Sequence, residues 1–268
     1  MTRQLRELER VESRVLGALR FVDAGTGTDV LTPLTLRALD GHARFVRNRS
    51  GLQVIAQWSS LSAHEASFQN PPADPIGNLT LHVVVTDTTG RYLPRRVAIP
   101  LPRDPDATHA TQPGSLFQPL RVPLYPAAVA ETGANWAVVH AAVTEQATGD
   151  ALGGALLRVR RNGDVIGRGL TDGRGQALVA LVGVPMLTFG QADEAVLVGE
   201  ITVTVEAVFD PATGTRVPAA QLAAGVRPPV PEVDPDALDA NGALPHAQQS
   251  VAVAARRSQS LELSISLP

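Results

Sequence analysis

The chain has no cysteine and no lysine, and each absence excludes a class of chemistry. Without thiols there are no disulfides, thiolate zinc sites, iron–sulfur clusters or cysteine nucleophiles. All 23 basic residues are arginine, which excludes a Schiff base, a Walker-type phosphate lysine and a lysine general base. We interpret the arginine bias, together with abundant Ala, Val, Leu, Gly and Pro, as the composition of a protein from a GC-rich genome.

Aromatic residues, long apolar runs and net charge are also scarce. Aromatics make up 4% of the 268 residues, which leaves no ladder for stacking nucleic-acid bases. The net charge of −3 gives no basic field for nucleic acid or an anionic membrane. No run approaches the ~20 apolar residues of a membrane-spanning helix, and residues 1–10 lack the apolar core of a secretory signal. We therefore expect a cytoplasmic protein, or one released from the cell within a particle.

What the sequence does contain is apolar and polar residues in alternation, which is typical of strands in antiparallel sheets. With 44% apolar and 18% charged residues the chain is globular, and its length suits two domains of ~100–150 residues. Glycine-containing turns separate the alternating runs. The predicted strands lie at 19–21, 34–38, 52–58, 79–86, 97–101, 120–124, 136–143, 155–160, 165–170, 176–182, 196–209 and 260–267.

One pattern occurs twice: a strand, a Thr-Gly turn, a second strand, an Asp/Asn-to-Gly turn and a third strand. The first copy carries Thr26-Gly27 and ends its second turn at Gly51. The second copy carries Thr148-Gly149 and ends at Gly175. The two marker glycines are 24 residues apart in the first copy and 26 in the second. The repeat predicts an all-β chain with two tandem antiparallel β-sandwiches, transthyretin-like or immunoglobulin-like in architecture.

The pattern also predicts where the domains lie. Residues 1–16 are expected to form a short amphipathic helix with Leu5 and Leu8 on its apolar stripe. The first sandwich is expected at 17–126, a linker at 127–134 and the second sandwich at 135–268. Within the second, a proline-rich insertion is expected at 226–248, and the composition of 226–242 favours an extended or polyproline conformation.

A longer motif in the second domain reads Ala147-Thr-Gly-Asp-Ala-Leu-Gly-Gly-Ala155, then Leu157 and Val159, then Thr171-Asp-Gly-Arg-Gly175. These residues resemble, position by position, the carboxypeptidase-regulatory-like, transthyretin-like sandwich superfamily, over about 70 residues. The first domain shares Thr26-Gly27, but has an Asn48-to-Gly51 turn and lacks the Gly-Ala step.

The resemblance implies sandwiches of seven or eight strands that act as spacers, folding aids, adhesin stalks or docking modules, usually without catalysis. Two activities of such families are not expected here. Isopeptide crosslinks need a lysine, which the chain lacks. The transthyretin-like hydrolases need a C-terminal Tyr-Arg-Gly-Ser, whereas this chain reads Ser264-Ile-Ser-Leu-Pro268.

The candidate chemistry is sparse. The six histidines, at 42, 64, 82, 109, 140 and 246, form no local metal-ligand pair. A metal or acid–base role stays open for His64 beside Glu65 and for His109 near Asp104 and Asp106. An iron site built on Tyr92 and Tyr125 has the required residue types but no supporting motif. We expect no catalytic, cofactor-binding or metal-binding residues, and no cofactor.

The function we expect is a non-enzymatic structural or adaptor protein that binds other subunits of a bacterial assembly, with a phage-tail-like or contractile-injection particle as the specific hypothesis. The alternative is a carbohydrate- or peptide-binding module that uses the long loops at 59–77 and 102–114. A third candidate is an accessory domain protein of an enzyme. The pairs Arg95-Arg96 and Arg256-Arg257 are interpreted as solvated turn or edge residues. Their alternative role is docking to an acidic partner. The expected partner-binding residues are Leu5, Leu8, Arg95, Arg96, Arg256 and Arg257.

Overall fold

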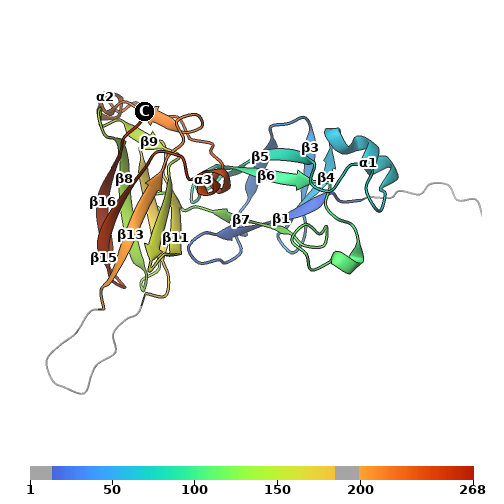
Figure 1. The fold of residues 1–268 in the computed structure, drawn as a ribbon, viewed down its shortest axis with the longest axis horizontal. Coiled ribbons are helices and arrows are strands. Elements are labelled where there is room, and N and C mark those ends of the chain that lie inside the picture. Colours follow the sequence, from blue (N-terminus) through green and yellow to red (C-terminus); the bar gives the residue numbers. More distant parts are fainter. Residues whose placement is uncertain (1–13, 185–198) are drawn as a thin grey trace, which may run out of the picture. The chain divides into compact units, whose positions relative to one another are not determined.

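The computed structural model of the chain describes residues 14–184 and 199–268 (Figure 1). Strands dominate and helices are short, which confirms the all-β prediction. The helix predicted at 1–16 lies outside the described residues except for 14–16, which are not helical. Leu16 instead donates its backbone N–H to Ile55 O at 2.9 Å, as a strand residue would. No helix in the described part of the chain has the length and apolar character that crossing a bilayer requires.

The regular elements are short and numerous. The strands are β1 (Gly17–Asp23), β2 (Leu34–Ala38), β3 (Ala43–Arg47), β4 (Gln53–Trp58), β5 (Leu79–Asp87), β6 (Arg95–Leu101), β7 (Leu120–Leu124), β8 (Ala137–Glu145), β9 (Ala151–Gly153), β10 (Leu156–Arg161), β11 (Asp164–Leu170), β12 (Gln176–Leu181), β13 (Ile201–Val208), β14 (Thr215–Val217), β15 (His246–Val253) and β16 (Ser258–Ile265). The helices are η1 (Ser59–Leu61), α1 (Ser62–Ser67), η2 (Ala107–His109), α2 (Ala219–Ala223) and α3 (Pro235–Ala240).

Hydrogen bonding joins the strands of the described residues into four sheets. Their orders are β3-β4-β1-β7, β2-β5-β6, β11-β10-β13-β15 and β12-β8-β9-β14, with β16 added on β8. The neighbours of β10, β13 and β12 run antiparallel, as the alternation predicts. In contrast, β16 runs parallel to β8, from Ser258 beside Val138 to Ile265 beside Glu145. The last strand therefore departs from the purely antiparallel prediction.

The chain divides into two compact units. Unit 1 contains the residues up to Arg20, Ala38–Leu81 and Ile99–Arg121. Unit 2 contains Phe21–Arg37, His82–Ala98 and Val122–Pro268. The predicted domains at 17–126 and 135–268 remain a prediction, and unit 2 also includes two segments that the prediction assigned to the first domain.

In unit 1 the two long loops have internal order. The chain after Trp58 folds into η1 and α1, and the buried Trp58 ring donates its Nε1–H to Asp40 O at 2.7 Å. The other loop closes around Arg103, which is 5% exposed and donates to Ser115 O at 3.0 Å and Gln118 O at 3.1 Å. A guanidinium with several fixed donors can satisfy the backbone carbonyls of a loop that forms no sheet.

The core of unit 2 lies between two sheets. Val139, Val179 and Leu263 point inward from one sheet, and Leu157 and Val205 from the other, each at most 3% exposed. Alternate residues on each strand supply this core because successive side chains of a strand face opposite sides. Burying one such side chain contributes ~1.5–3 kcal/mol, so this shared core is the main stabilising feature of the unit.

The segment 231–240, which we call the acidic strap, crosses unit 2 within the predicted proline-rich insertion. The strap residues Asp234 and Asp236 accept from Arg95 Nη2 at 3.5 and 2.6 Å. The same guanidinium donates to Pro123 O at 2.9 Å and Arg96 O at 3.1 Å. Arg95 is completely buried, so its charge is matched inside the unit by carboxylates and carbonyls.

Two more carboxylates of the acidic strap bind arginines. Glu232 accepts from Arg37 Nη2 at 2.9 Å. Asp239 bridges Arg158 and Arg168, with both contacts at 3.1 Å. Asp234 also caps α3 by accepting the backbone N–H of Asp236, which is the usual role of an N-cap aspartate.

Apolar residues of the acidic strap join a second cluster. Val233 and Leu238, at 1% and 3% exposure, pack with Tyr125, Leu156 and Leu170. The prediction of an extended or polyproline segment over 226–242 is therefore wrong at Pro235–Ala240, which form α3. Leu238 lies on α3, and burial of that side chain accounts for a helix in a proline-rich segment.

Candidate interaction surface

The outer face of β8 and its neighbours carries polar side chains. His140 and Ala142 alternate with the inward-facing residues of β8. The register places Ala142 between Gln176 of β12 and Glu262 of β16, while Ser260 lies beside His140. One strip across three strands therefore presents imidazole, amide, hydroxyl and carboxylate groups on one surface.

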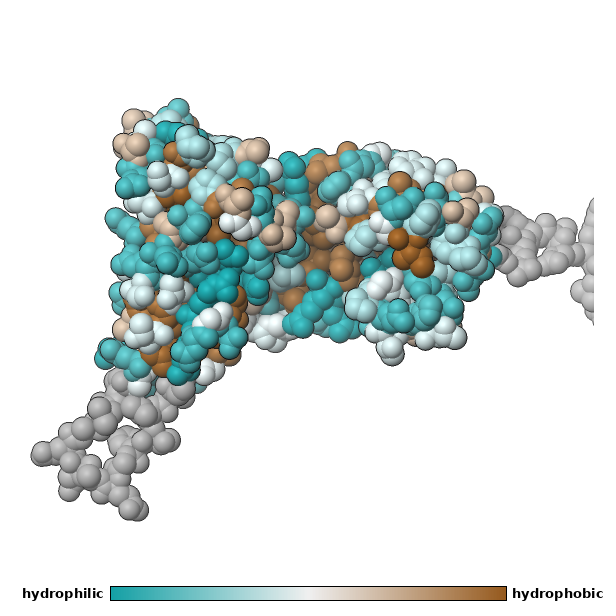
Figure 2. Space-filling view, viewed as in Figure 1, coloured by the Kyte–Doolittle hydropathy of each residue, from teal (hydrophilic) through white to brown (hydrophobic). Residues whose placement is uncertain are grey.

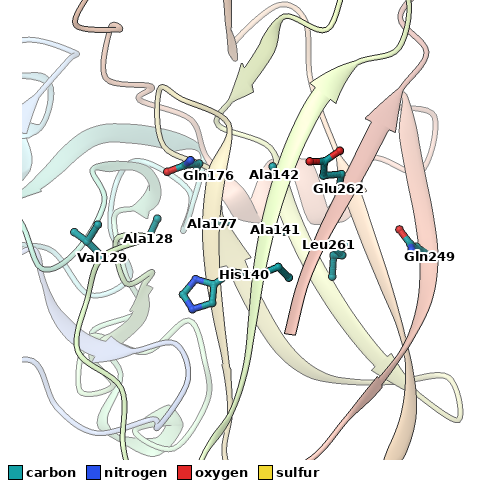
Figure 3. Close-up of a pocket in the computed structure, with 11 residues that line it drawn as sticks. Ala128, Val129, His140, Ala141, Ala142, Gln176, Ala177, Gln249, Leu261 and Glu262 are labelled. Atoms are coloured by element: carbon teal, nitrogen blue, oxygen red, sulfur yellow. The ribbon is translucent and has the colours of Figure 1, made fainter. Parts of the chain in front are cut away.

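This strip forms the floor of a hollow that we call the trough. Its volume is about 690 Å³, and Figure 3 shows Ala128 and Val129 on a loop at one side of the strands. Val129 is 90% exposed. The residues that line the trough are Ala128, Val129, His140, Ala141, Ala142, Gln176, Ala177, Gln249, Ser260, Leu261 and Glu262.

The trough suits a neutral polar ligand better than an ion. Its only carboxylate among these residues belongs to Glu262, and no arginine lines it. The amides of Gln176 and Gln249 both donate and accept hydrogen bonds, which matches peptide groups and sugar hydroxyls. Within residues 14–184 and 199–268, no three His, Asp or Glu side chains are grouped so as to hold a metal ion.

Next to the trough the same face is covered. Val138, Leu178 and Ala180 point to the outer side of β8 and β12 but are at most 4% exposed, and Trp136 packs against them. The open polar strip is therefore bounded by a closed apolar patch, and a partner has access to the trough rather than to the whole face.

The predicted partner residues do not gather in one place. Leu5 and Leu8 lie outside the described residues. The interpretation of Arg95 as a solvated residue is wrong, because its side chain is 0% exposed and its acidic partners, Asp234 and Asp236, belong to this chain. The backbone N–H of the next residue, Arg96, donates to Val233 O at 2.7 Å.

The second predicted pair lies in the turn between β15 and β16. Arg256 has a positive φ of 63° and donates from Nε to Asn135 Oδ1 at 3.0 Å. Arg257 is exposed and forms a 3.2 Å ion pair with Glu200. The turn comes shortly before the trough residues of β16 in the sequence, but neither guanidinium lines the trough.

The candidate acid–base histidines differ in environment. His109 Nδ1 lies 2.7 Å from Asp104 Oδ2, and this hydrogen bond raises the pKa of His109. The pKa of Asp104 is lowered, first by the backbone N–H of Asp106 and then by the imidazole. His64 is buried against Phe68, with rings 5.0 Å apart. The imidazole of His109 therefore satisfies one loop carboxylate, that of Asp104, which is a structural use of the side chain.

The two candidate iron-binding tyrosines are both buried and serve the fold. Tyr92 donates its hydroxyl to Asp23 Oδ2 at 2.9 Å; burial, with this bond, raises the pKa of Tyr92 to about 12. Burial also raises the pKa of Tyr125 to about 12. Tyr125 packs in the cluster with the acidic strap, and the Arg95 guanidinium lies 5.9 Å from its ring centre.

The sequence interpretation missed the carboxylates that order the turns. Each of these carboxylates lies three or four residues before a turn glycine and is at most 6% exposed. Each accepts hydrogen bonds from backbone N–H groups of its turn; they are Asp23, Asp87 and Glu145. The Thr148 hydroxyl and the Ala147 N–H lower the pKa of Glu145 in this way. An acidic residue upstream of each Thr-Gly was the signal that could have revealed them.

No protein-family model and no curated protein sequence matches this chain.

Proposed function

We propose that the chain is a non-enzymatic structural or adaptor protein whose trough binds another subunit of a larger assembly. The observation that carries this proposal is the trough itself: polar, nearly uncharged, and built on a continuous sheet. A docking partner binds well to hydrogen-bonding groups on a fixed surface. Such a surface loses little conformational entropy on binding, so less of the binding free energy is offset. The acidic strap supports the same function, since its ion pairs and apolar contacts stiffen the unit that carries the trough.

The specific hypothesis for the host is a phage-tail-like or contractile-injection particle. It rests on the resemblance of the second predicted domain to transthyretin-like spacer sandwiches, and on the proposal that the chain is a tandem pair of such modules. This step is an analogy from fold, which by itself does not determine function.

The experiment is sedimentation of tagged chains from the native host on a density gradient. The wild-type chain is expected to sediment with a particle far larger than its 28.2 kDa mass. Ala142→Arg fills the floor of the trough and is expected to move the chain to the top of the gradient. Ala220→Arg, on the exposed surface of α2, is the matched control and is expected to sediment like wild type. A wild-type chain that sediments at its own mass would contradict the proposal.

A carbohydrate- or peptide-binding module is the second candidate, favoured by the amide and hydroxyl groups in the trough. Sugar hydroxyls and extended peptides both pair with such groups. Calorimetric titration with oligosaccharides and short neutral peptides distinguishes the two functions. A defined affinity that Ala142→Arg abolishes, in a chain that does not sediment with a particle, would favour this candidate.

A further inference from the structure

Among residues 14–184 and 199–268, one edge of the strand β16 has no partner strand. It pairs with β8 alone, while the preceding strand β15 lies at the edge of the facing sheet. Figure 1 shows these two strands side by side in unit 2. An exposed strand edge offers a row of backbone donors and acceptors to another strand.

Two hydrogen bonds establish which backbone groups of β16 face outward. Val138 N donates to Arg257 O at 3.0 Å, and Gln146 N donates to Ile265 O at 2.9 Å. Alternate residues of a strand in a parallel ladder bond to the same neighbour, so the odd-numbered residues face β8. The residues whose backbone groups face away from β8 are Ser258, Ser260, Glu262 and Ser264.

These outward backbone groups are nearly free. Within the described residues, the one other contact to them is a long bond of 3.5 Å that Gln259 Nε2 donates to Ser260 O. The side chains of the four residues are exposed, and three of them are small serines. Proline, lysine and a shift of register, which commonly protect an edge, are absent along β16, and Glu262 is its one charged residue.

We propose that β16 pairs antiparallel with β16 of a second copy of this chain, about a twofold axis through Leu261. This register aligns outward-facing residues with outward-facing residues: Ser260 with Glu262, and Ser258 with Ser264. Each pair occurs twice, giving about eight backbone hydrogen bonds. Self-complementarity of this kind is what a twofold interface requires.

The single charge on β16 selects this register. Moving the axis to Glu262 would place the two Glu262 carboxylates directly opposite each other, which is unfavourable. Moving it toward Ser260 would shorten the paired segment. With the axis at Leu261, each Glu262 lies opposite a serine. The sheets that contain β8 and β16 in the two copies then form one continuous sheet. This inference goes beyond the proposed function and holds whichever assembly contains the chain.

The first test is sedimentation equilibrium of the purified full chain. A monomer–dimer equilibrium is expected for wild type. Ser260→Pro removes one outward N–H per copy, so it is expected to weaken dimerisation roughly tenfold or more while preserving the bonds to β8. Ser250→Pro is the matched control: Pro245 O faces β13, so the N–H of Ser250 faces outward on β15, and unchanged dimerisation is expected. A monomeric wild type, a dimeric Ser260→Pro or a monomeric Ser250→Pro would overturn the proposal.

A crosslinking measurement tests the register without proline. Because the chain has no cysteine, single variants Ser260→Cys and Glu262→Cys carry the only thiols. On mild oxidation, a mixture of the two is expected to crosslink faster than either alone, since residue 260 faces residue 262 across the axis. Equal rates for the mixture and for Glu262→Cys alone, or no crosslinked dimer at all, would overturn the register.

Discussion

At the scale of single residues, buried charge in this protein is used to hold segments in place. Arg95 is the clearest case, because its guanidinium is completely buried and bonds to two carboxylates of the acidic strap and two backbone carbonyls. From the sequence, Arg95-Arg96 indicated only a dense positive charge. The carboxylate partners of Arg95 lie about 140 residues away along the chain, so no local sequence pattern could reveal them.

Replacing Arg95 is therefore expected to lower the stability of the folded chain. Arg95→Met is expected to lower the free energy of unfolding by about 2–4 kcal/mol, because carbonyls and carboxylates lose a buried donor. Arg37→Met is the matched control, since that side chain is 58% exposed and its ion pair with Glu232 is worth about 0–1 kcal/mol. Urea denaturation of both variants measures the difference, and equal losses would show that Arg95 is not a structural anchor.

The two tyrosines give a prediction at alkaline pH. Both folded pKa values are about 12, above the unfolded value of about 10. Their stabilising contribution is therefore complete below pH ~10 and is lost as pH rises from ~10 toward ~12. Tyrosinate absorbance of the folded chain is expected to have its midpoint near 12, and that of the chain in urea near 10. A folded midpoint near 10 would contradict the burial of both hydroxyls.

His109 gives a prediction near neutral pH. Its hydrogen bond with Asp104 raises the pKa of the imidazole, so the protonated form is stabilised in the folded chain. This stabilisation is complete below the ordinary histidine pKa of ~6.5 and is lost as pH rises through the raised value. In an NMR titration, Asp104→Asn is expected to lower the midpoint of His109. A midpoint unchanged by the substitution would show that the 2.7 Å contact does not govern it.

At the scale of elements, alternation of apolar and polar residues predicted several strands well. The runs at 155–160, 165–170 and 176–182 correspond closely to β10, β11 and β12. Of these, β10 lies inside its sheet, whereas β11 and β12 lie at sheet edges. The signal failed for β15, where Gln249 interrupts the apolar positions and no core-facing stripe is visible in the sequence. Most residues of β15 are exposed, so few large apolar side chains mark its core-facing positions in the sequence.

The acidic strap is the element that sequence reasoning misplaced, and its helix makes a testable claim. Leu238→Ala is expected to lower the free energy of unfolding by about 2–4 kcal/mol, because the side chain is 3% exposed in the cluster with Leu156 and Leu170. Leu222→Ala in α2, which buries none of its residues, is expected to cost under about 1 kcal/mol. Thermal or urea unfolding measures both, and a cost for Leu238→Ala as small as the control would mean that α3 is not docked.

At the scale of the whole molecule, the sequence indicated fold class, while the candidate site came from the structure. The trough combines side chains from β8, β12, β15 and β16, and only pairing of the strands brings these distant residues together. Figure 2 shows hydrophilic and hydrophobic residues interspersed over the visible surface, so surface hydropathy alone would not have distinguished a docking site. The register of β8 with β12 and β16 is the information that the sequence pattern lacked.

The most direct test is photo-crosslinking in living cells of the native host. A photoreactive residue replaces Gln176, which lines the trough, or Gln221, which is exposed on α2. Crosslinks from position 176 to one defined protein subunit, which sediments with the same large particle as the chain, are the expected result. The adduct should be absent from position 221. Crosslinks of equal yield from both positions, or none from position 176, would contradict the trough as a docking surface.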